Sequence, residues 1–296
     1  MIKTGIQLHP GAGPELISML LRHPDVDLRW VSGASMPADG VTSLFDSLQG
    51  VAAQIPSVPD FDAIDLYIGP DTAQLDSFLG GNVRAKAILT NMMMRPVSAS
   101  DGLPGVCEFN RKAMVRGARV VLQPEVPTLL GALALMPLAK NLLLNTPVTG
   151  TMLLPWRGST VRVPAATMPP MDFKVLRENI LEQLQQSFTA PIEITSIEHP
   201  DTFACAVLTL DIRMSLDQLR KLYADFYADH RHVFFPTRAI TRDMVMNTNK
   251  TAISLGHDGF GRLIVTTAFD ARYKGGAGNV MHILNLLFGF DELTGF

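Results

Sequence analysis

The sequence contains few cysteines and few long apolar runs. Two of its 296 residues are cysteine, Cys107 and Cys205, and they lie far apart along the chain. Such a pair does not make a disulfide framework. The apolar runs are shorter than a membrane span, and the first residues lack the apolar core of a signal peptide. From these absences we expect a cytoplasmic protein with no membrane as a partner.

Basic residues are not concentrated in the sequence either. The chain holds 25 Lys and Arg against 28 Asp and Glu, which makes a formal net charge of −3. No basic block and no alternation of basic and aromatic residues is present, so nucleic acid is not expected as a partner. The hydrophobic share of 47% and the length of 296 residues indicate one or two globular domains.

The first half of the chain alternates strand patterns with helix patterns. Residues 2–8 predict a strand, residues 9–13 a glycine-containing turn, and residues 14–22 a helix that begins at Pro14. Such alternation is typical of a parallel sheet with helices on both faces, whose ligands bind at the carboxyl ends of the strands. Further strands are expected at 27–32, 62–69, 86–90 and 119–122, and further helices at 73–79 and 128–144.

The pattern changes after residue 147. A helix is expected at 173–188, and Ser215 is expected to cap a second helix that extends through Phe226. The second half therefore predicts an α+β domain with a mixed or antiparallel sheet over residues 147–274. Its expected strands are 192–197, 203–213, 251–257 and 262–269, the last two joined by a hairpin-like turn.

A glycine-rich turn and an apolar helix end the chain. Val280, Ile283, Leu284 and Leu287 share one helix face, and Gly289 is placed to end the helix in the left-handed conformation. Two interpretations are open. The turn can pack closely beneath a buried helix, or its exposed N–H groups can hold an anion or cofactor.

Four motifs make the chain similar to one known family. Their order and spacing resemble the N-acetyl-γ-glutamyl-phosphate reductase family, within the semialdehyde dehydrogenase superfamily, from end to end. The tail carries the clearest match, as Lys274-Gly-Gly-Ala-Gly-Asn279 followed by Asn285-Leu-Leu-Phe-Gly289 and Glu292-Leu-Thr-Gly-Phe296. The others are Gly13-Pro-Glu15-Leu16, Glu108-Phe-Asn110-Arg111 and Pro127-Thr128.

The resemblance implies a fold and a reaction. The fold would be two-domain α/β: a Rossmann-like, NAD(P)-binding-type domain over 1–146 plus 275–296, and an α+β domain over 147–274 that mediates homo-oligomer contacts. The reaction would be NADPH-dependent reduction of an acyl phosphate to an aldehyde, in arginine biosynthesis. That chemistry uses a cysteine thiolate to form a thioester, followed by hydride transfer, with a histidine as acid–base.

The resemblance also assigns site positions in this chain. Apart from the resemblance, Arg95, Arg111 and Arg177 could together bind a small anionic ligand or substrate, and Arg111 could equally support its loop by hydrogen bonding. The positions assigned to NADP are Gly11, Gly13, Ser32, Lys274, Gly275, Gly278 and Asn279.

The chain departs from the family pattern where the chemistry is expected. Glu125 occupies the position of the nucleophilic cysteine, and Arg177 that of the histidine. Pro10 replaces a glycine of the dinucleotide turn, and Gly33 stands where an arginine commonly meets the NADP 2′-phosphate. These changes argue against NADP binding. They predict a divergent homologue that cannot perform the reduction and acts instead in binding, regulation or assembly.

Two alternatives stay open at this point. The chain could be an active NADP-dependent oxidoreductase with displaced residues, or could use Glu125 in a different reaction. It could also be a subunit that pairs with an active paralogue.

Other residues are weaker candidates for a site. His230 and His232 would form a metal pair if their segment were a strand, but no third ligand lies nearby and a loop is favoured. The methionines at 92–94 fit either an adaptable pocket or a core gap. Cys107 is expected to be a loop thiol without an activating partner, and Cys205 a packing residue.

Overall fold

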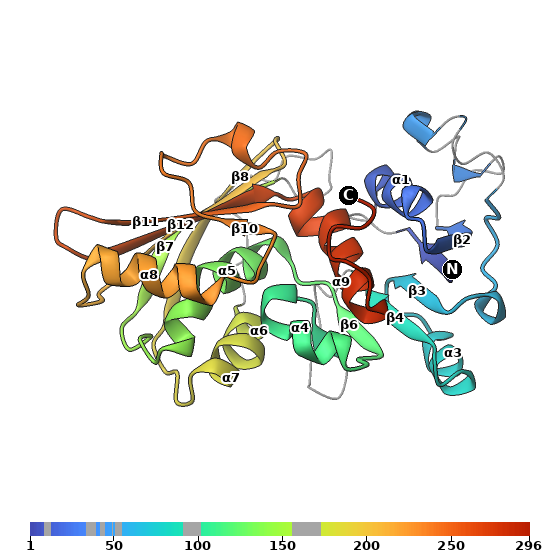
Figure 1. The fold of residues 1–296 in the computed structure, drawn as a ribbon, viewed down its shortest axis with the longest axis horizontal. Helices are drawn as coiled ribbons and strands as arrows, with labels where there is room; N and C mark the ends of the chain where they lie inside the picture. The colour runs from blue at the N-terminus through green and yellow to red at the C-terminus, as the bar shows by residue number, and fades with distance from the viewer. Residues whose placement is uncertain are drawn as a thin grey trace. The chain divides into compact units, whose positions relative to one another are not determined.

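The protein, analysed as a computed structural model, forms two compact units (Figure 1). Unit 1 comprises Met1–Pro124 and Gly276–Phe296, and unit 2 comprises Glu125–Gly275. The structure describes residues 1–8, 13–33, 40–41, 45–48, 50, 55–90, 102–155 and 173–296. No helix in these described ranges is long and apolar enough to span a membrane.

Unit 1 is built on a six-stranded sheet in the order β2-β1-β3-β4-β6-β5. All of its strand pairs are parallel, as the alternation of strands and helices predicts. The strands are β1 (Ile2–Gln7), β2 (Val26–Ser32), β3 (Leu66–Gly69), β4 (Lys86–Leu89), β5 (Leu103–Pro104) and β6 (Val120–Leu122).

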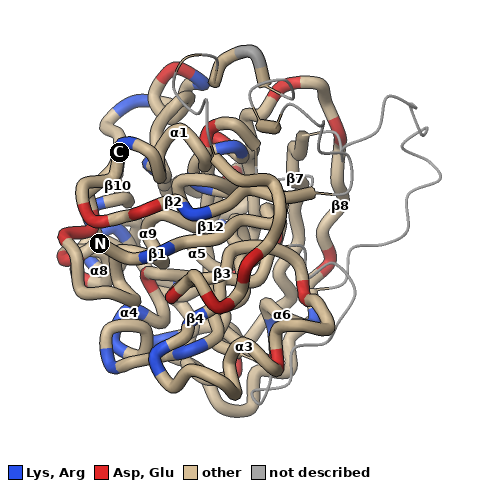
Figure 2. The backbone as a smooth tube through the Cα atoms, turned by 90° about the vertical axis from the view of Figure 1, so that its right-hand side faces the viewer, with Lys and Arg blue, Asp and Glu red and all other residues tan. Residues whose placement is uncertain are grey.

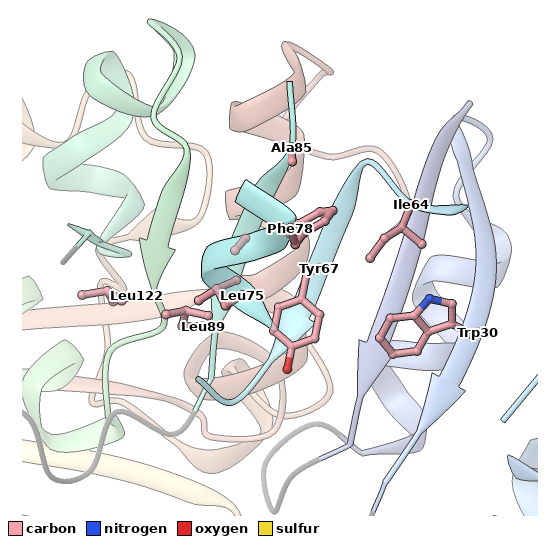
Figure 3. Packing of buried hydrophobic residues seen from close by; sticks show 9 residues of the cluster. Trp30, Ile64, Tyr67, Leu75, Phe78, Ala85, Leu89 and Leu122 are labelled. Carbon is pink, nitrogen blue, oxygen red and sulfur yellow. The ribbon is translucent and has the colours of Figure 1, made fainter. Parts of the chain in front are cut away.

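Helices lie on both sides of this sheet (Figure 1). On one side an aromatic and aliphatic cluster that includes Trp30, Tyr67 and Phe78 lies beneath α3 (Figure 3). On the other side α1 and α4 both pack against α9. The helices of unit 1 are α1 (Pro14–Arg22), α3 (Leu75–Gly81), α4 (Cys107–Val115) and α9 (Gly278–Phe288), with short 3₁₀ turns η1 (Asp46–Leu48) and η2 (Phe61–Ala63).

Unit 2 is built on a second six-stranded sheet, in the order β10-β11-β12-β9-β7-β8. Its central strand pairs are antiparallel, and its two outer pairs are parallel. The sheet is therefore mixed, as predicted. Its strands are β7 (Val148–Pro155), β8 (Ile192–His199), β9 (Phe203–Leu210), β10 (Val233–Phe234), β11 (Thr251–His257) and β12 (Leu263–Asp270).

The helix that follows β6, α5 (Val126–Lys140), lies within unit 2. Every residue from Pro127 to Ala139 is buried, and α5 packs against β9 and β12. The hydroxyls of Tyr223 and Tyr227 donate to the carbonyl oxygens of Ala134 and Leu133, at 2.5 and 2.6 Å. The division between the units thus falls at 124/125, whereas the sequence placed it near 146. A helix that is apolar on all sides needs a layer around it, which unit 2 provides.

The remaining helical segments of unit 2 are short, apart from α8 (Leu216–Phe226). Ser215 caps α8 as predicted: its hydroxyl accepts from the Gln218 backbone N–H, and the Gln218 side chain accepts from the Ser215 N–H. The others are α6 (Lys174–Leu176), a π-helical stretch η4 (Arg177–Leu181), α7 (Glu182–Leu184), the 3₁₀ turn η5 (Arg242–Met244) and the turn η6 (Tyr273–Ala277), which leads into unit 1.

Two sequence predictions are decided by these elements. Gly289 ends α9 with φ of 73°, in the left-handed conformation expected of a helix-ending glycine. Cys107, by contrast, is not a loop residue, because it is the first residue of α4 and its exposed fraction is 1%. Helix α4 was not predicted from the sequence. Two of its buried positions, Glu108 and Asn110, are polar and interrupt the apolar periodicity that indicates a helix.

Candidate functional site

Glu125 lies at the N-terminus of α5, directly before the first helical residue. Its backbone is extended, with φ −66° and ψ 153°, and its half-buried side chain makes no capping hydrogen bond. The N-terminal end of a helix carries a partial positive charge, which favours a carboxylate at this place. A carboxylate can accept a proton or a hydrogen bond here, but it cannot supply a thiolate.

Gly275 packs against the start of the same helix. A Cβ at this position would lie 2.8 Å from Cγ2 of Val126 and 3.2 Å from Cε2 of Phe269. A larger side chain would therefore require the Val126 side chain or the turn to shift. The preceding residue, Lys274, is fully buried. Of these two predicted cofactor positions, Lys274 is therefore buried within unit 2, and Gly275 is partly buried against α5.

Asn279 connects three segments of unit 1. Its Nδ2 donates to the Gly105 carbonyl oxygen and to Oε1 of Gln123, both at 2.9 Å, and its Oδ1 lies 3.8 Å from the Cys107 sulfur. The side chain is fully buried, and the preceding Gly278 is buried as well. Both amide hydrogens of Asn279 are therefore used by the protein itself.

Arg111 contacts the C-terminal tail. Its guanidinium lies 2.5 Å from Oε1 of Glu292, and the other oxygen of that carboxylate lies 2.8 Å from Nε2 of His282. We call these three residues the tail lock. Arg111 is 44% exposed, whereas the side chains of Glu292 and His282 are 8% and 2% exposed. This predicted anion-binding arginine is therefore engaged by a carboxylate of its own chain.

Two further buried polar residues hold the same tail. Asn285 on α9 lies 3.0 Å from Nε2 of His23, and its Nδ2 donates to the Thr294 carbonyl oxygen at 2.9 Å. Sequence analysis did not single out His282, Asn285 or Glu292 as interacting residues. The signal was present, because polar residues interrupt an otherwise apolar helix at 279, 282 and 285.

Arg177, which the resemblance assigns to the position of the family histidine, is held within unit 2. Its guanidinium donates to the Ala190 carbonyl oxygen at 2.8 Å and lies 5.0 Å from the centre of the Phe188 ring. These contacts connect η4 to the loop before β8. The Arg177 side chain therefore holds this loop in place.

The turn after β1 would have to hold the phosphates of a dinucleotide. Gly13 precedes α1, and Pro14 occupies its first helical position, where it offers no N–H to a phosphate. Ser32, at the end of β2, is buried, and neither Ser32 nor Gly33 carries the positive charge that a 2′-phosphate would need. Together with the engaged amide of Asn279, these described residues do not fit NADP. Gly11, Pro10, Arg95 and the methionines at 92–94 lie outside the described residues.

Neither cysteine is placed or activated as a nucleophile. The buried Cys107 thiol is directed to the Gly105 carbonyl oxygen, 3.9 Å away, and to Asn279. Cys205 lies in β9, where partial burial raises the pKa of its thiol to about 11. Reactive cysteines have a lowered pKa in an electropositive, accessible environment, and neither the raised pKa of Cys205 nor the burial of Cys107 fits that description.

The two histidines of the 230–232 segment do not form a metal pair in a strand. They precede β10; His230 packs against the rings of Phe226 and Tyr227, and His232 is buried. In the ranges that the structure covers, no group of three or more His, Cys, Asp or Glu residues is arranged to hold a metal ion.

Known proteins resemble this chain over its whole length in sequence and in fold. No family model matches it. The N-acetyl-gamma-glutamyl-phosphate reductase of Phocaeicola vulgatus is 30% identical over all of this chain and 98% of that protein, and that of Parabacteroides distasonis is 28% identical with the same coverage. Aspartate semialdehyde dehydrogenase II of Vibrio cholerae, in complex with ASA, shares the fold, with a TM-score of 0.71, 13% identity and 98% of both chains covered. This chain belongs to the N-acetyl-gamma-glutamyl-phosphate reductase family.

Proposed function

We propose that this chain is a family member that does not perform the thiol-dependent reductase reaction and acts instead through binding, regulation or assembly. One observation carries the proposal. The residue directly before α5 is Glu125, and neither Cys107 nor Cys205 is exposed and activated to take over the role of a nucleophile.

The chemistry of an acyl phosphate explains why this observation matters. A thiolate displaces phosphate and forms a thioester, from which an aldehyde is made by hydride transfer. A carboxylate is a weaker nucleophile and would form an acid anhydride in place of the thioester. Glu125 therefore cannot stand in for the missing thiol in this sequence of steps.

The remaining polar side chains support the same proposal. Neighbouring parts of the protein already engage the polar groups of three such side chains, Asn279, Arg111 and Arg177. With Pro14 at the start of α1, and without charge at Ser32 and Gly33, we further propose that NADP binds weakly or not at all.

The first test is an assay of the purified protein. We expect no aldehyde oxidation with phosphate and NADP⁺, and no reduction of the acyl phosphate with NADPH. Family-type turnover near the typical enzyme value of about 10 s⁻¹ would overturn the proposal. A calorimetric titration with NADPH in the same buffer tests the cofactor separately, and tight binding would contradict the second part of the proposal.

A second test measures the thiols directly. Under native conditions we expect iodoacetamide to label the wild-type protein slowly, because Cys107 is buried and the pKa of Cys205 is raised. Glu125→Cys should add one fast-reacting thiol, since a helix N-terminus lowers the pKa of a cysteine. Asp229→Cys, on an exposed loop, is the matched control and should react at the rate of an ordinary surface thiol. Fast labelling of the wild type at either native cysteine would contradict the central observation.

A further inference from the structure

At the amino-terminal edge of the parallel sheet in unit 1, the first residues of neighbouring strands are joined by backbone hydrogen bonds. The Ile2 backbone N–H donates to the Asp25 carbonyl oxygen at 2.6 Å, and the Asp65 N–H to that of Lys3 at 2.7 Å. The row continues with the Lys86 N–H bonded to the Asp65 carbonyl oxygen at 3.0 Å. Side chains at these starts therefore have a defined order along the edge, which follows the strand order β2-β1-β3-β4-β6.

Carboxylates gather on one part of this edge, which we call the acidic half. It comprises the segments that lead into β2 and β3, and between them the start of β1 carries two cations, the Met1 amino group and Lys3. Within the described residues, none of its four carboxylates forms an ion pair with a cation. They belong to Asp25, Asp60, Asp62 and Asp65.

Cations gather on the other part, which we call the basic half. It comprises the segments that lead into β4 and β6, together with the exposed face of α4. Arg111 on this helix is engaged by Glu292, but five other cations are not paired with a carboxylate in the described part of the chain. They belong to Arg84, Lys86, Lys112, Arg116 and Arg119. In Figure 2 the blue segments gather around α4 and β4, and red segments lie beside β3.

Two of these cations are held in place by neutral groups. The Arg119 guanidinium donates to the carbonyl oxygens of Leu79, Asn82 and Ala85. The Lys86 ammonium donates to the Leu287 carbonyl oxygen at 2.6 Å and lies 5.0 Å from the centre of the Phe288 ring. These contacts fix the positions of the charges without neutralising them.

The two halves adjoin where the Lys86 N–H meets the Asp65 carbonyl oxygen, but their centres are far apart. Their centres, near β1 and β6, are separated by three strand spacings, or about 14 Å. The Debye length at physiological ionic strength is about 8 Å, so most of this attraction is screened. The edge also exposes aliphatic side chains that a contact could bury: Met1, Val83 and Val115 are 78%, 87% and 56% exposed.

We propose that this edge is a two-fold interface with a second copy of the chain. A two-fold axis that passes between the starts of β3 and β4 would place the acidic half of each copy on the basic half of the other. A second copy fits better than an acidic or a basic partner, because the edge presents both signs side by side. The contact would depend on ionic strength, as interfaces with complementary charge do. It does not rest on the loss of reductase activity.

Charge reversal on the full-length chain tests this interface. The first variant, Arg84→Glu with Lys112→Glu, reverses two cations of the basic half, and the second, Asp25→Lys with Asp62→Lys, reverses two carboxylates of the acidic half. A matched control, Lys140→Glu with Arg213→Glu, changes the same number of exposed cations in unit 2. The mass of each protein is measured by light scattering in about 20 mM and about 500 mM NaCl.

We expect the wild type and the control to halve their mass between low and high salt. Each variant alone should show the halved mass already at low salt, with a dissociation constant raised roughly a hundredfold by its like-charge contacts. An equimolar mixture of the two variants should regain the wild-type mass, because each acidic surface then meets a basic one. Equal masses for the wild type and all variants at low salt would overturn the proposal, and so would a mixture that stays dissociated.

Discussion

The starts of two helices, α9 and α5, differ in how they use polar side chains. At the start of α9, Asn279 is buried and bonded to another segment of unit 1, as are His282 and Asn285 further along the helix. At α5, Glu125 is half exposed and caps nothing. The first helix start is thus built into the fold, while the second leaves a functional group available.

This difference shows that residues shared with a family can be structural, whereas a residue that differs from the family need not affect the fold. The residues of the tail motif hold segments of unit 1 together, through the tail lock and the amide of Asn279. A match of that kind is evidence about architecture. The residue directly before α5 makes no capping hydrogen bond, so it has no comparable role in holding the fold together.

The largest effect is expected from a substitution that breaks the tail lock. Glu292→Ala removes the carboxylate between Arg111 and His282, and we expect the free energy of unfolding of unit 1 to fall by about 3 kcal/mol. Urea titration in a Trp156→Phe background measures it, because Trp30 then reports on unit 1 alone. The control Asp229→Ala, at an exposed position, should change stability by less than about 0.5 kcal/mol. An unchanged midpoint for Glu292→Ala would mean that the tail does not hold α9.

A smaller effect is expected at the first turn of α9. Asn279→Ala leaves the Gly105 carbonyl oxygen and the Gln123 side chain without their donor, and should cost about 2 kcal/mol by the same titration. Because the amide also contacts the Cys107 thiol, iodoacetamide should label Cys107 faster in this variant. If neither the urea midpoint nor the labelling rate moves, the amide is not structural and is free to serve a ligand.

The smallest effect is expected at α5. Glu125→Ala removes a side chain that makes no capping hydrogen bond, so it should lower the stability of unit 2 by about 0.5 kcal/mol or less, through its interaction with the helix dipole. Thermal unfolding followed by circular dichroism is the measurement. A loss as large as that at Glu292 would contradict the contrast between the two helix starts.

Much of the fold is predictable from local patterns. The strand at 251–257 was expected with the bounds that β11 has, and Ser215 and Gly289 act as the helix signals they resemble. These features depend on neighbouring residues, through side-chain alternation, a capping hydrogen bond and a left-handed φ. Strand β7 was missed, because Gly150 and Thr151 interrupt its apolar residues and its pairing with β8 and β9 comes from distant segments.

The sequence by itself determined the family resemblance, the two kinds of sheet and the presence of a carboxylate at residue 125. These conclusions need only residue identity and short-range periodicity. Tertiary structure alone decided which polar groups are already engaged, as when Arg111 meets a glutamate 181 positions along the chain. It also brought together the charged residues of the amino-terminal edge, acidic ones from segments near residues 25 and 62 and basic ones from segments near 84 and 116. Net charge and spacing along the chain cannot show that separation, because electrostatic contact depends on distance in space.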